Sequence, residues 1–393
     1  MGIKMLGAAR IGKLQSAMAK HRIDAMICIK PENSFYLSGF NPIIYSHPVV
    51  AVLPAEGEPQ ILVHALRDDH ARAEAWVSKV HLFGSWSNKK TMGPSWLKAL
   101  ASIAENLALG RARIGLEFDF LPVNKLEQIR EALPQASFVD CSELLSTTRM
   151  IKDPFEIESL RAASRIADAG METAIGAIAA GVSEREISIA AMATMNRVWN
   201  DRFPSAEVCE FGSLEGGTHN GLWCWCMIDD RICLNTDNPT DRRPKRGEVV
   251  LAFIWTVCNG MHAENERLVA VGQLGDARRR AYDAVLQIRE QTKTMLKPGT
   301  PMADIYGAAR QEYIRLGYGD YVPGRIGHGL GLGAHEPPFI DQHTQRVLEP
   351  NMIVTFEPGL SLEDCALQHS DTVLITETGH EFLTRTSNGF LSV

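Results

Sequence analysis

Three segments of this chain place acidic and imidazole side chains inside otherwise apolar or glycine-rich runs. The first segment follows a long apolar run and contains Glu264, the second contains His328 and His335, and the third contains Glu357. Carboxylates and imidazoles transfer protons in enzymes, and they also bind divalent cations. Because burying such groups together costs free energy, the pattern indicates a functional site rather than ordinary core positions.

Two carboxylates in one pocket push each other's pKa values apart, which separates an acid from a base. We therefore expect Glu264 and Glu357 to bind a positively charged or NH-rich group of a small-molecule substrate. His328 would then transfer a proton to or from the attacking water or the leaving nitrogen. The alternative is a buried ion-pair network without catalysis, since structural networks also cluster charged groups.

Composition excludes several classes of protein. The 393 residues include 40 Lys plus Arg and 47 Asp plus Glu, giving a net charge of −7, with 45% hydrophobic and 22% charged residues. These values are typical of a globular protein and exclude global disorder. No basic excess is present to bind nucleic acid, and no apolar run approaches the roughly 20 residues of a membrane span. The eight cysteines are scattered, so we expect reduced thiols and a cytoplasmic protein.

The elements that position these side chains form two predicted domains. Strands alternate with helices over residues 1–150, which predicts an α/β domain with a mostly parallel or mixed sheet. Residues 151–393 begin with two long helices, near 154–180 and 183–199. They continue with a hairpin over 247–272 and two further helices near 276–296 and 301–316. The turn dipeptide Asn259-Gly260 lies between two apolar runs and favours that hairpin.

Four motifs carry a resemblance to the pita-bread family of methionine aminopeptidase, prolidase, Xaa-Pro aminopeptidase and creatinase. They are GHGLGLGAHEPP at 327–338, FEPG at 356–359, KDPFEI at 152–157 and LKPG at 296–299. The resemblance covers about residues 10–390. It implies an α+β fold with an N-terminal creatinase-like α/β domain and a C-terminal pita-bread domain. It also implies a homodimer in which the N-terminal domain of one subunit covers the partner's site.

The resemblance implies positions for metal ligands. The family's peptidases hold two metal ions on Asp, Asp, His, Glu and Glu, in that order. The corresponding residues here are Phe253, Glu264, His328, Glu357 and Ser370. A phenyl ring cannot ligate a divalent cation, and with the first and last carboxylates absent we do not expect a dinuclear site.

Two alternatives remain for this site. One divalent ion such as Zn, Mn or Fe binds Glu264, His328 and Glu357, since three protein ligands plus water form an acceptable catalytic arrangement. Otherwise the same three residues are catalytic without a metal, as in creatinase. We favour the second alternative and expect no cofactor.

The resemblance also implies residues that bind the substrate. His335, in the motif 327–338, contacts substrate in the family. His47 and Phe339 lie where creatinase has two arginines that bind the creatine carboxylate, and Tyr45 belongs to the same N-terminal loop as His47. The loop histidine of creatinase has no counterpart here, which leaves Asp237 as a candidate in its place. Creatine itself is therefore not the expected substrate.

Aromatic residues cluster in sequence around the expected site. Trp223 and Trp225 alternate along one predicted strand and share a face, and Phe253 and Trp255 lie on the next strand. Core packing is one interpretation of these rings. The other is an aromatic wall for a cationic group, in which each contact contributes about 0.5–2 kcal/mol.

The sequence leaves the last position of the site open among Ser370, His369 and Asp371. His219 lies in a glycine-rich segment and is not included in the site. The function that we favour is creatinase-like hydrolysis of a C–N bond in a small nitrogen-rich or cationic metabolite. The alternatives are a metal-dependent Xaa-Pro dipeptidase or aminopeptidase with a single ion, a lyase of the dimethylsulfoniopropionate type, and a non-catalytic binding protein.

Overall fold

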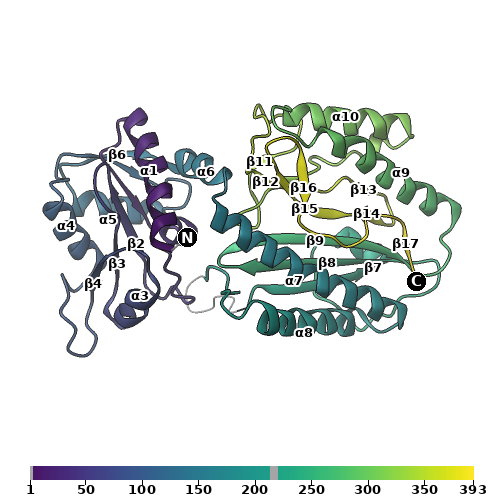
Figure 1. Ribbon diagram of the computed structural model, residues 1–393, viewed down its shortest axis with the longest axis horizontal. Helices are drawn as coiled ribbons and strands as arrows, with labels where there is room; N and C mark the ends of the chain where they lie inside the picture. Colours follow the sequence, from purple (N-terminus) through teal and green to yellow (C-terminus); the bar gives the residue numbers. More distant parts are fainter. Residues whose placement is uncertain (1–2, 213–219) are drawn as a thin grey trace. The chain divides into compact units, whose positions relative to one another are not determined.

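The computed structural model describes residues 3–212 and 220–393, so His219 lies outside the described residues. This part of the chain divides into two compact units (Figure 1). The first comprises residues 3–149 together with 210–212, and the second comprises 150–209 and 220–393. A short segment far along the chain therefore belongs to the N-terminal unit, which a single sequence boundary does not describe.

The N-terminal unit contains a mixed six-stranded sheet in the order β4-β3-β2-β1-β5-β6. The β1–β5, β5–β6 and β3–β4 pairs are parallel, and β2 is antiparallel to both of its neighbours. Its strands are β1 Ala25–Cys28, β2 Val50–Pro54, β3 Gln60–His64, β4 Lys79–Phe83, β5 Arg113–Leu116 and β6 Ser137–Asp140. Its helices are α1 Ile3–His21, α2 Pro31–Ser38, α3 Asp68–Glu74, α4 Trp96–Asn106, α5 Val123–Ala132 and α6 Ser142–Met150.

The C-terminal unit contains a nine-stranded sheet. Its main path runs β11-β10-β12-β15-β9-β8-β7, with β16 on β15 and β17 on β9. Its main strands are β7 Leu222–Ile228, β8 Val249–Cys258, β9 Met261–Ala270, β10 His328–Gly329, β11 Glu336–Phe339, β12 Ile353–Phe356 and β15 Ser370–Ile375. Shorter strands are β13 Gly359–Ser361, β14 Ala366–Gln368, β16 His380–Phe382 and β17 Leu391–Ser392. Its helices are α7 Pro154–Ala179, α8 Glu184–Arg202, α9 Asp276–Thr292 and α10 Met302–Arg315.

Local sequence signals explain the main elements of this unit. Helices α7 and α8 both begin with a capping box, in which Asp153 pairs with Glu156 and Ser183 with Glu186. The hairpin β8–β9 turns at Asn259-Gly260, where both residues have positive φ angles of 50° and 78°. Two successive positive φ angles are what a two-residue type I′ turn requires. The predicted hairpin and long helices are therefore present.

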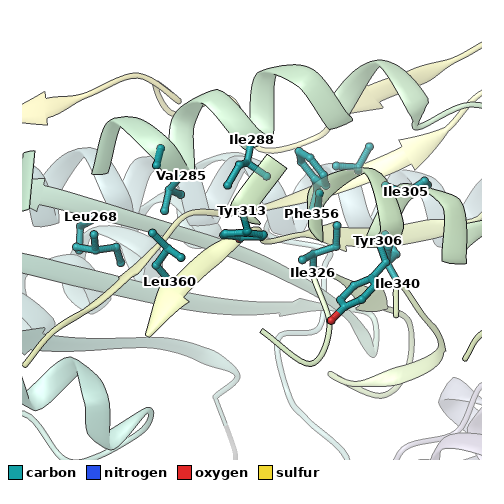
Figure 2. Close-up of a cluster of buried hydrophobic side chains, with 14 of the residues drawn as sticks. Leu268, Val285, Ile288, Ile305, Tyr306, Tyr313, Ile326, Ile340, Phe356 and Leu360 are labelled. Carbon is teal, nitrogen blue, oxygen red and sulfur yellow. The ribbon is translucent and has the colours of Figure 1, made fainter. Parts of the chain in front are cut away.

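Alternation along β8 divides its side chains between two apolar cores. Val250, Ala252 and Ile254 pack in one core with α7 and α8, while Leu251 and Phe253 belong to another core with α9 and α10. Figure 2 shows this second cluster beneath the two helices. The sheet and the helices packed on it thus hold β8 and β9 in place, so that side chains of these strands can face a cavity.

The structure adds elements that the sequence prediction leaves out, among them α3, α6 and β4. Helix α9 ends at Thr292 and continues only as a short 3₁₀ turn, Lys293–Met295, so it is shorter than predicted. Among the described residues, no helix combines the length and the apolar character needed to cross a bilayer.

Candidate active site

Strands β9, β10 and β12 bring the three predicted catalytic side chains together. Glu264 lies within β9, His328 begins β10, and Glu357 directly follows β12. Glu264 and His328 are 1% and 0% exposed, and the Glu357 side chain is 10% exposed. His328 Nε2 lies 3.5 Å from Glu264 Oε2 and 3.8 Å from Glu357 Oε1. The cluster therefore joins three segments that are spread over nearly one hundred residues of the chain.

The hydrogen bonds of His328 determine which nitrogen faces the carboxylates. Its Nδ1 lies 3.0 Å from the Gly329 carbonyl oxygen, which can only accept, so Nδ1 carries the hydrogen. Its Nε2 is buried and has no hydrogen-bond partner. An Nδ1–H donor to a backbone carbonyl with a free Nε2 is the usual arrangement of a metal-binding histidine.

Glu264, His328 and Glu357 each offer one ligand atom, and all three atoms lie within 4.8 Å of one another. One nitrogen and two carboxylate oxygens form a donor set that suits zinc or a similar divalent ion. The orphaned Nε2 and the paired carboxylates fit such an ion, because it would bond the nitrogen and neutralise the charge. The types and positions of these donor atoms therefore fit a metal site.

The two carboxylates and the imidazole of the cluster shift one another's pKa values, as expected for ionisable groups that lie close together. Burial and repulsion from Glu264 raise the pKa of Glu357 to about 8. Burial also acts to raise the pKa of Glu264, but the neighbouring His328 and Ser370 outweigh it and lower that pKa. Burial lowers the pKa of His328, and the two carboxylates reverse this effect and raise it. The pocket therefore favours bound positive charge.

A cavity of about 590 Å³ opens onto the cluster. Its lining includes Glu264, Glu357, His335, Phe253 and Trp255, all predicted from the sequence. The His335 ring lies 4.3 Å from that of His328 and 5.1 Å from that of Trp255, measured between centroids. Partial burial and the nearby His328 lower the pKa of His335 to about 4, so its imidazole is neutral near pH 7.

The aromatic side chains form a contiguous wall. The centroid of the Trp225 ring lies 5.9 Å from that of Phe253 and 5.8 Å from that of Trp255, in both cases edge-to-face. Trp223 stacks on Trp225 at 5.9 Å and is 37% exposed. Phe253 and Trp255 face the main cavity, while Trp223 and Trp225 line a smaller neighbouring one. Trp225 therefore acts on the main cavity by supporting its rings.

Sequence reasoning missed several polar residues of the cavity, among them Glu266, Arg325 and Gln368. Glu266 lies two residues beyond Glu264 on β9 and therefore faces the same side of the sheet. The spacing of Glu264 and Glu266 is the sequence signal from which Glu266 could have been identified. The Arg325 guanidinium lies over the Phe339 ring at 5.4 Å, and its Nε is 3.7 Å from Glu357 Oε1.

The candidates for the last position have different surroundings. The Ser370 hydroxyl donates a short hydrogen bond to Glu264 Oε1, so this residue orients a carboxylate. His369 Nε2 is hydrogen-bonded to the Tyr282 hydroxyl. Asp371 is fully buried between two arginines. Of the three, Ser370 is the residue in contact with the cluster.

Asp371 belongs to a buried bridge behind the cluster. Its carboxylate accepts hydrogen bonds from Arg267 at 2.6 Å and from Arg289. Arg267 also donates to the Ser370 carbonyl at 2.8 Å, and Arg289 donates to the Phe356 carbonyl at 2.7 Å. The bridge thus fixes the backbone beside Ser370 and beside Glu357.

The remaining predicted residues lie elsewhere. Asp237 pairs with Arg231 at 3.3 Å and is not among the residues lining the cavity, where its neighbours Asn235 and Thr236 stand instead. Tyr45 and His47 belong to the N-terminal unit, and the His47 ring stacks on His64 with centroids 3.9 Å apart. Their role in a partner subunit's site stays a prediction.

Comparisons with known proteins agree on one family. The model of "Metallopeptidase family M24" matches residues 158–377, and that of "Creatinase/Prolidase N-terminal domain" matches residues 10–151. The Xaa-Pro dipeptidase of Pyrococcus furiosus is 28% identical over 384 residues, covering 97% of this chain and 99% of the relative.

Solved structures give the same picture. The prolidase from Pyrococcus furiosus superposes with a TM-score of 0.77 at 27% identity, covering 95% of this chain and 99% of the other. The Xaa-Pro dipeptidase from Bacillus anthracis shares the fold, with a TM-score of 0.83 at 23% identity, covering 98% of this chain and all of the other. The α+β pita-bread fold with its N-terminal domain is thereby confirmed.

The expectation that the site needs no cofactor is wrong. The matching family is one of metallopeptidases, its relatives are prolidases, and Glu264, His328 and Glu357 form a cluster suited to a metal ion. The expectation gave too much weight to the loss of carboxylates at Phe253 and Ser370. Those losses leave the three-ligand set intact.

Proposed function

The chain belongs to metallopeptidase family M24 and is a hydrolase of this family, and from that premise we propose a metal-dependent hydrolase with a single-ion site. Its substrate class is a small amide or peptide of the Xaa-Pro dipeptide type. The ion would be held by Glu264, His328 and Glu357. This function replaces the creatinase-like hydrolysis favoured on sequence grounds, because the relatives are Xaa-Pro dipeptidases and prolidases.

One observation carries the proposal: the buried Nε2 of His328 has no partner although it faces two carboxylates. An orphaned buried nitrogen costs about 1–3 kcal/mol, which a protein retains only where another group completes it. Its Nδ1 is already satisfied by Gly329, so the ring is oriented to use Nε2. A structural ion pair would instead close the 3.5 Å gap to Glu264 into a hydrogen bond.

The proposal of one ion rests on the two positions that differ from the family's ligands. Phe253 presents a ring that offers no lone pair. The Ser370 hydroxyl is engaged with Glu264. The chain thus supplies three ligands for one ion. The carboxylates that the resemblance implies for a second ion are absent at Phe253 and Ser370.

The remaining residues have roles that follow from their contacts. A bound divalent ion supplies Lewis-acid polarisation and a water of lowered pKa. Ser370 orients Glu264, and the Arg267–Asp371–Arg289 bridge holds the adjacent backbone. Neutral His335 can accept or donate a hydrogen bond to substrate, and Phe253 and Trp255 exclude water from one wall.

The test is elemental analysis of protein purified without chelator, combined with hydrolysis assays on Xaa-Pro dipeptides with Mn²⁺, Co²⁺ and Zn²⁺. We expect about one ion per subunit and metal-stimulated release of proline. Glu264→Gln and Glu357→Gln should lose both, because each removes one charged ligand. Glu363→Gln, which removes an exposed carboxylate, is the matched control and should retain both.

Three outcomes would overturn the proposal. A stoichiometry of two ions per subunit would show that other residues replace the missing ligands. Metal content below about a tenth of an ion, with no stimulated hydrolysis of any dipeptide in the panel, would reject a metal-dependent site of the kind described. Retention of metal in both glutamine variants would place the ion elsewhere.

A further inference from the structure

A smaller cavity lies beside the aromatic wall, and we call it the side cavity. Its volume is about 330 Å³, and it is lined by side chains of α8, of β7 and of the segment that follows β7. Strand β7 is the last strand in the main path of the nine-stranded sheet, so the side cavity lies at a sheet edge (Figure 1). Its volume falls within the range of about 300–1,000 Å³ that is typical of small-molecule sites.

One part of the side cavity is an exposed apolar surface. Trp223 of β7 is 37% exposed and Ile189 of α8 is 56% exposed, although both are large apolar side chains. Both line the side cavity together with Met192. Scattered apolar side chains on a surface need no explanation, whereas apolar side chains gathered around one hollow are typical of a binding site. The planes of the Trp223 and Trp225 rings differ by only 18°, so this pair forms a flat platform.

The other part of the side cavity is positively charged. Arg185 lies in the first turn of α8, is exposed and lines the cavity. Its neighbour Glu184 pairs with Arg231 at 3.1 Å. Its other neighbour, Glu186, pairs with Arg243 at 3.0 Å. Among the described residues, the Arg185 guanidinium itself has no ion-pair or hydrogen-bond partner, so its charge is available to a ligand.

The charge of the side cavity is opposite to that of the main cavity. The main cavity is lined by Glu264, Glu266 and Glu357. None of the described residues that line the side cavity is Asp or Glu, and Asn238 adds an amide that donates hydrogen bonds. Guanidinium and amide N–H groups are donors that proteins use to bind carboxylates. An anionic ligand therefore suits the side cavity, whereas positive charge suits the main cavity.

The two cavities share a wall. Trp225 lines the side cavity, and its ring meets the Phe253 and Trp255 rings of the main cavity edge-on, with centroids 5.9 and 5.8 Å apart. Closely packed rings leave little free space, so a shift of one ring is felt by its neighbours. A ligand that rests on the Trp223–Trp225 platform therefore also constrains the wall of the main cavity.

We propose that the side cavity is a binding site for a small organic acid with a flat apolar body, such as an aromatic carboxylate. The carboxylate pairs with Arg185, and the apolar body lies on Trp223 beside Ile189. This ligand is an effector rather than a substrate, because it acts on the main cavity through Trp225. The site uses none of the proposed metal ligands, so the inference does not depend on the proposed function.

The first experiment is calorimetric titration of the full chain with 3-phenylpropionate and with 3-phenylpropan-1-ol, which has the same ring without the charge. Wild type should bind the acid about tenfold more tightly than the alcohol, as expected for one charged contact. Arg185→Gln should remove this preference, and Trp223→Ala should weaken the binding of both ligands severalfold. Arg197→Gln removes another exposed arginine of α8 and is the matched control, which should bind both ligands as wild type does. All three replaced side chains are exposed, so the variants should fold.

A further variant separates the side cavity from the main cavity, where a bound metal ion also attracts carboxylates. Glu357 lines the main cavity and is not among the residues lining the side cavity. Glu357→Gln should therefore bind 3-phenylpropionate with the affinity of wild type.

Labelling with 5-fluorotryptophan gives a readout that is independent of catalysis. The chain has seven tryptophans, and single Trp→Phe replacements assign their ¹⁹F resonances. Addition of 3-phenylpropionate should shift the resonances of Trp223 and Trp225, and that of Trp255 by a smaller amount. The resonance of Trp86, which belongs to the N-terminal unit, should not move.

The outcomes also separate this inference from the proposed function. Absence of saturable binding of the acid, or equal affinity for it in wild type and Arg185→Gln, would overturn the inference. Loss of binding in Glu357→Gln, or a shifted Trp255 resonance with an unchanged Trp223 resonance, would place the acid in the main cavity and would also overturn it. Charge-dependent binding that requires Arg185, in protein without metal or dipeptide hydrolysis, would support the inference while the proposed function fails.

Discussion

Each unit of the protein buries a carboxylate centre, and the two centres differ in how completely their polar atoms are bonded. In the N-terminal unit, Glu117 is 0% exposed and accepts hydrogen bonds from Ile29 N at 2.6 Å, Lys30 N at 2.9 Å and Asn33 Nδ2 at 2.7 Å. In the C-terminal unit, His328 faces Glu264 and Glu357 with no hydrogen bond from its Nε2.

This difference separates a structural carboxylate from a ligand-binding one. Glu117 directly follows β5 and holds both the backbone that leads into α2 and the Asn33 side chain within that helix, so each of its oxygens has a partner within the same unit. The Glu264 cluster keeps a nitrogen and a carboxylate directed at a cavity. Burial is common to both centres, so the unmet hydrogen-bonding capacity, rather than burial, distinguishes the proposed site from the structural centre.

Removing the orphaned nitrogen should produce the largest effect. We expect His328→Asn to lower metal-dependent hydrolysis about a thousandfold or more, because a metal contributes several kcal/mol to the transition state. The free energy of unfolding should change by no more than about 1 kcal/mol, since Nε2 makes no hydrogen bond in the protein. A metal-stimulated dipeptide assay measures the first effect, and urea denaturation measures the second. A loss of several kcal/mol in stability would show that His328 is structural, like Glu117.

The bridge behind the site should be structural and should also affect the ion. Asp371→Asn leaves two buried guanidinium groups without their charged partner, which should cost about 3–5 kcal/mol of unfolding free energy. Metal affinity should fall about 10–100-fold, because the backbone beside Ser370 and Glu357 loses its support. Asp283→Asn, which breaks an exposed pair with Arg279, is the control and should leave the stability nearly unchanged. If Asp371→Asn folds fully and binds the metal with unchanged affinity, Asp371 does not support the site.

The pH dependence of stability tests the structural centre. Burial raises the pKa of Glu117 to about 7, above the value near 4.5 expected in the unfolded chain. The folded state therefore binds this proton more tightly, and the stabilisation is fully present below about pH 4.5 and lost as the pH rises through about 7. Between pH 5 and 8, wild type should lose up to about 3 kcal/mol relative to Glu117→Gln, measured by urea denaturation of both proteins. Parallel pH profiles would show that the hydrogen bonds keep Glu117 ionised.

Much of the fold could be predicted because its signals are local. The capping residues Asp153 and Ser183 begin helices, and Asn259-Gly260 turns a hairpin, each through chemistry contained within a few residues. The cluster of Glu264, His328 and Glu357 was predicted from motifs around His328 and Glu357. Short helices such as α6 lack comparable signals, since tertiary packing rather than local propensity stabilises them.

The missed residues depend on long-range structure. The spacing from Glu264 places Glu266 on the same face of β9, but only the structure shows that this face opens onto a cavity. The pairing of Glu266 with Gln368 spans 102 positions in sequence. Arg325 is close to Phe339 only because β10 and β11 are paired. The error about the cofactor has another origin, since absent ligands were counted while the hydrogen bonds of the remaining histidine are visible only in the structure.

The smallest expected effect concerns the aromatic wall beside the cluster. Trp225 is half-buried and touches Phe253 and Trp255 edge-on, so Trp225→Ala should loosen both rings without removing a polar contact. For a cationic substrate we expect KM to rise about two- to thirtyfold, the equivalent of about 0.5–2 kcal/mol, with kcat nearly unchanged. Trp225→Phe should retain most of the affinity. Because a neutral substrate gains little from ring faces, its KM should change less, and equal changes for both substrates would reduce Trp225 to a packing residue.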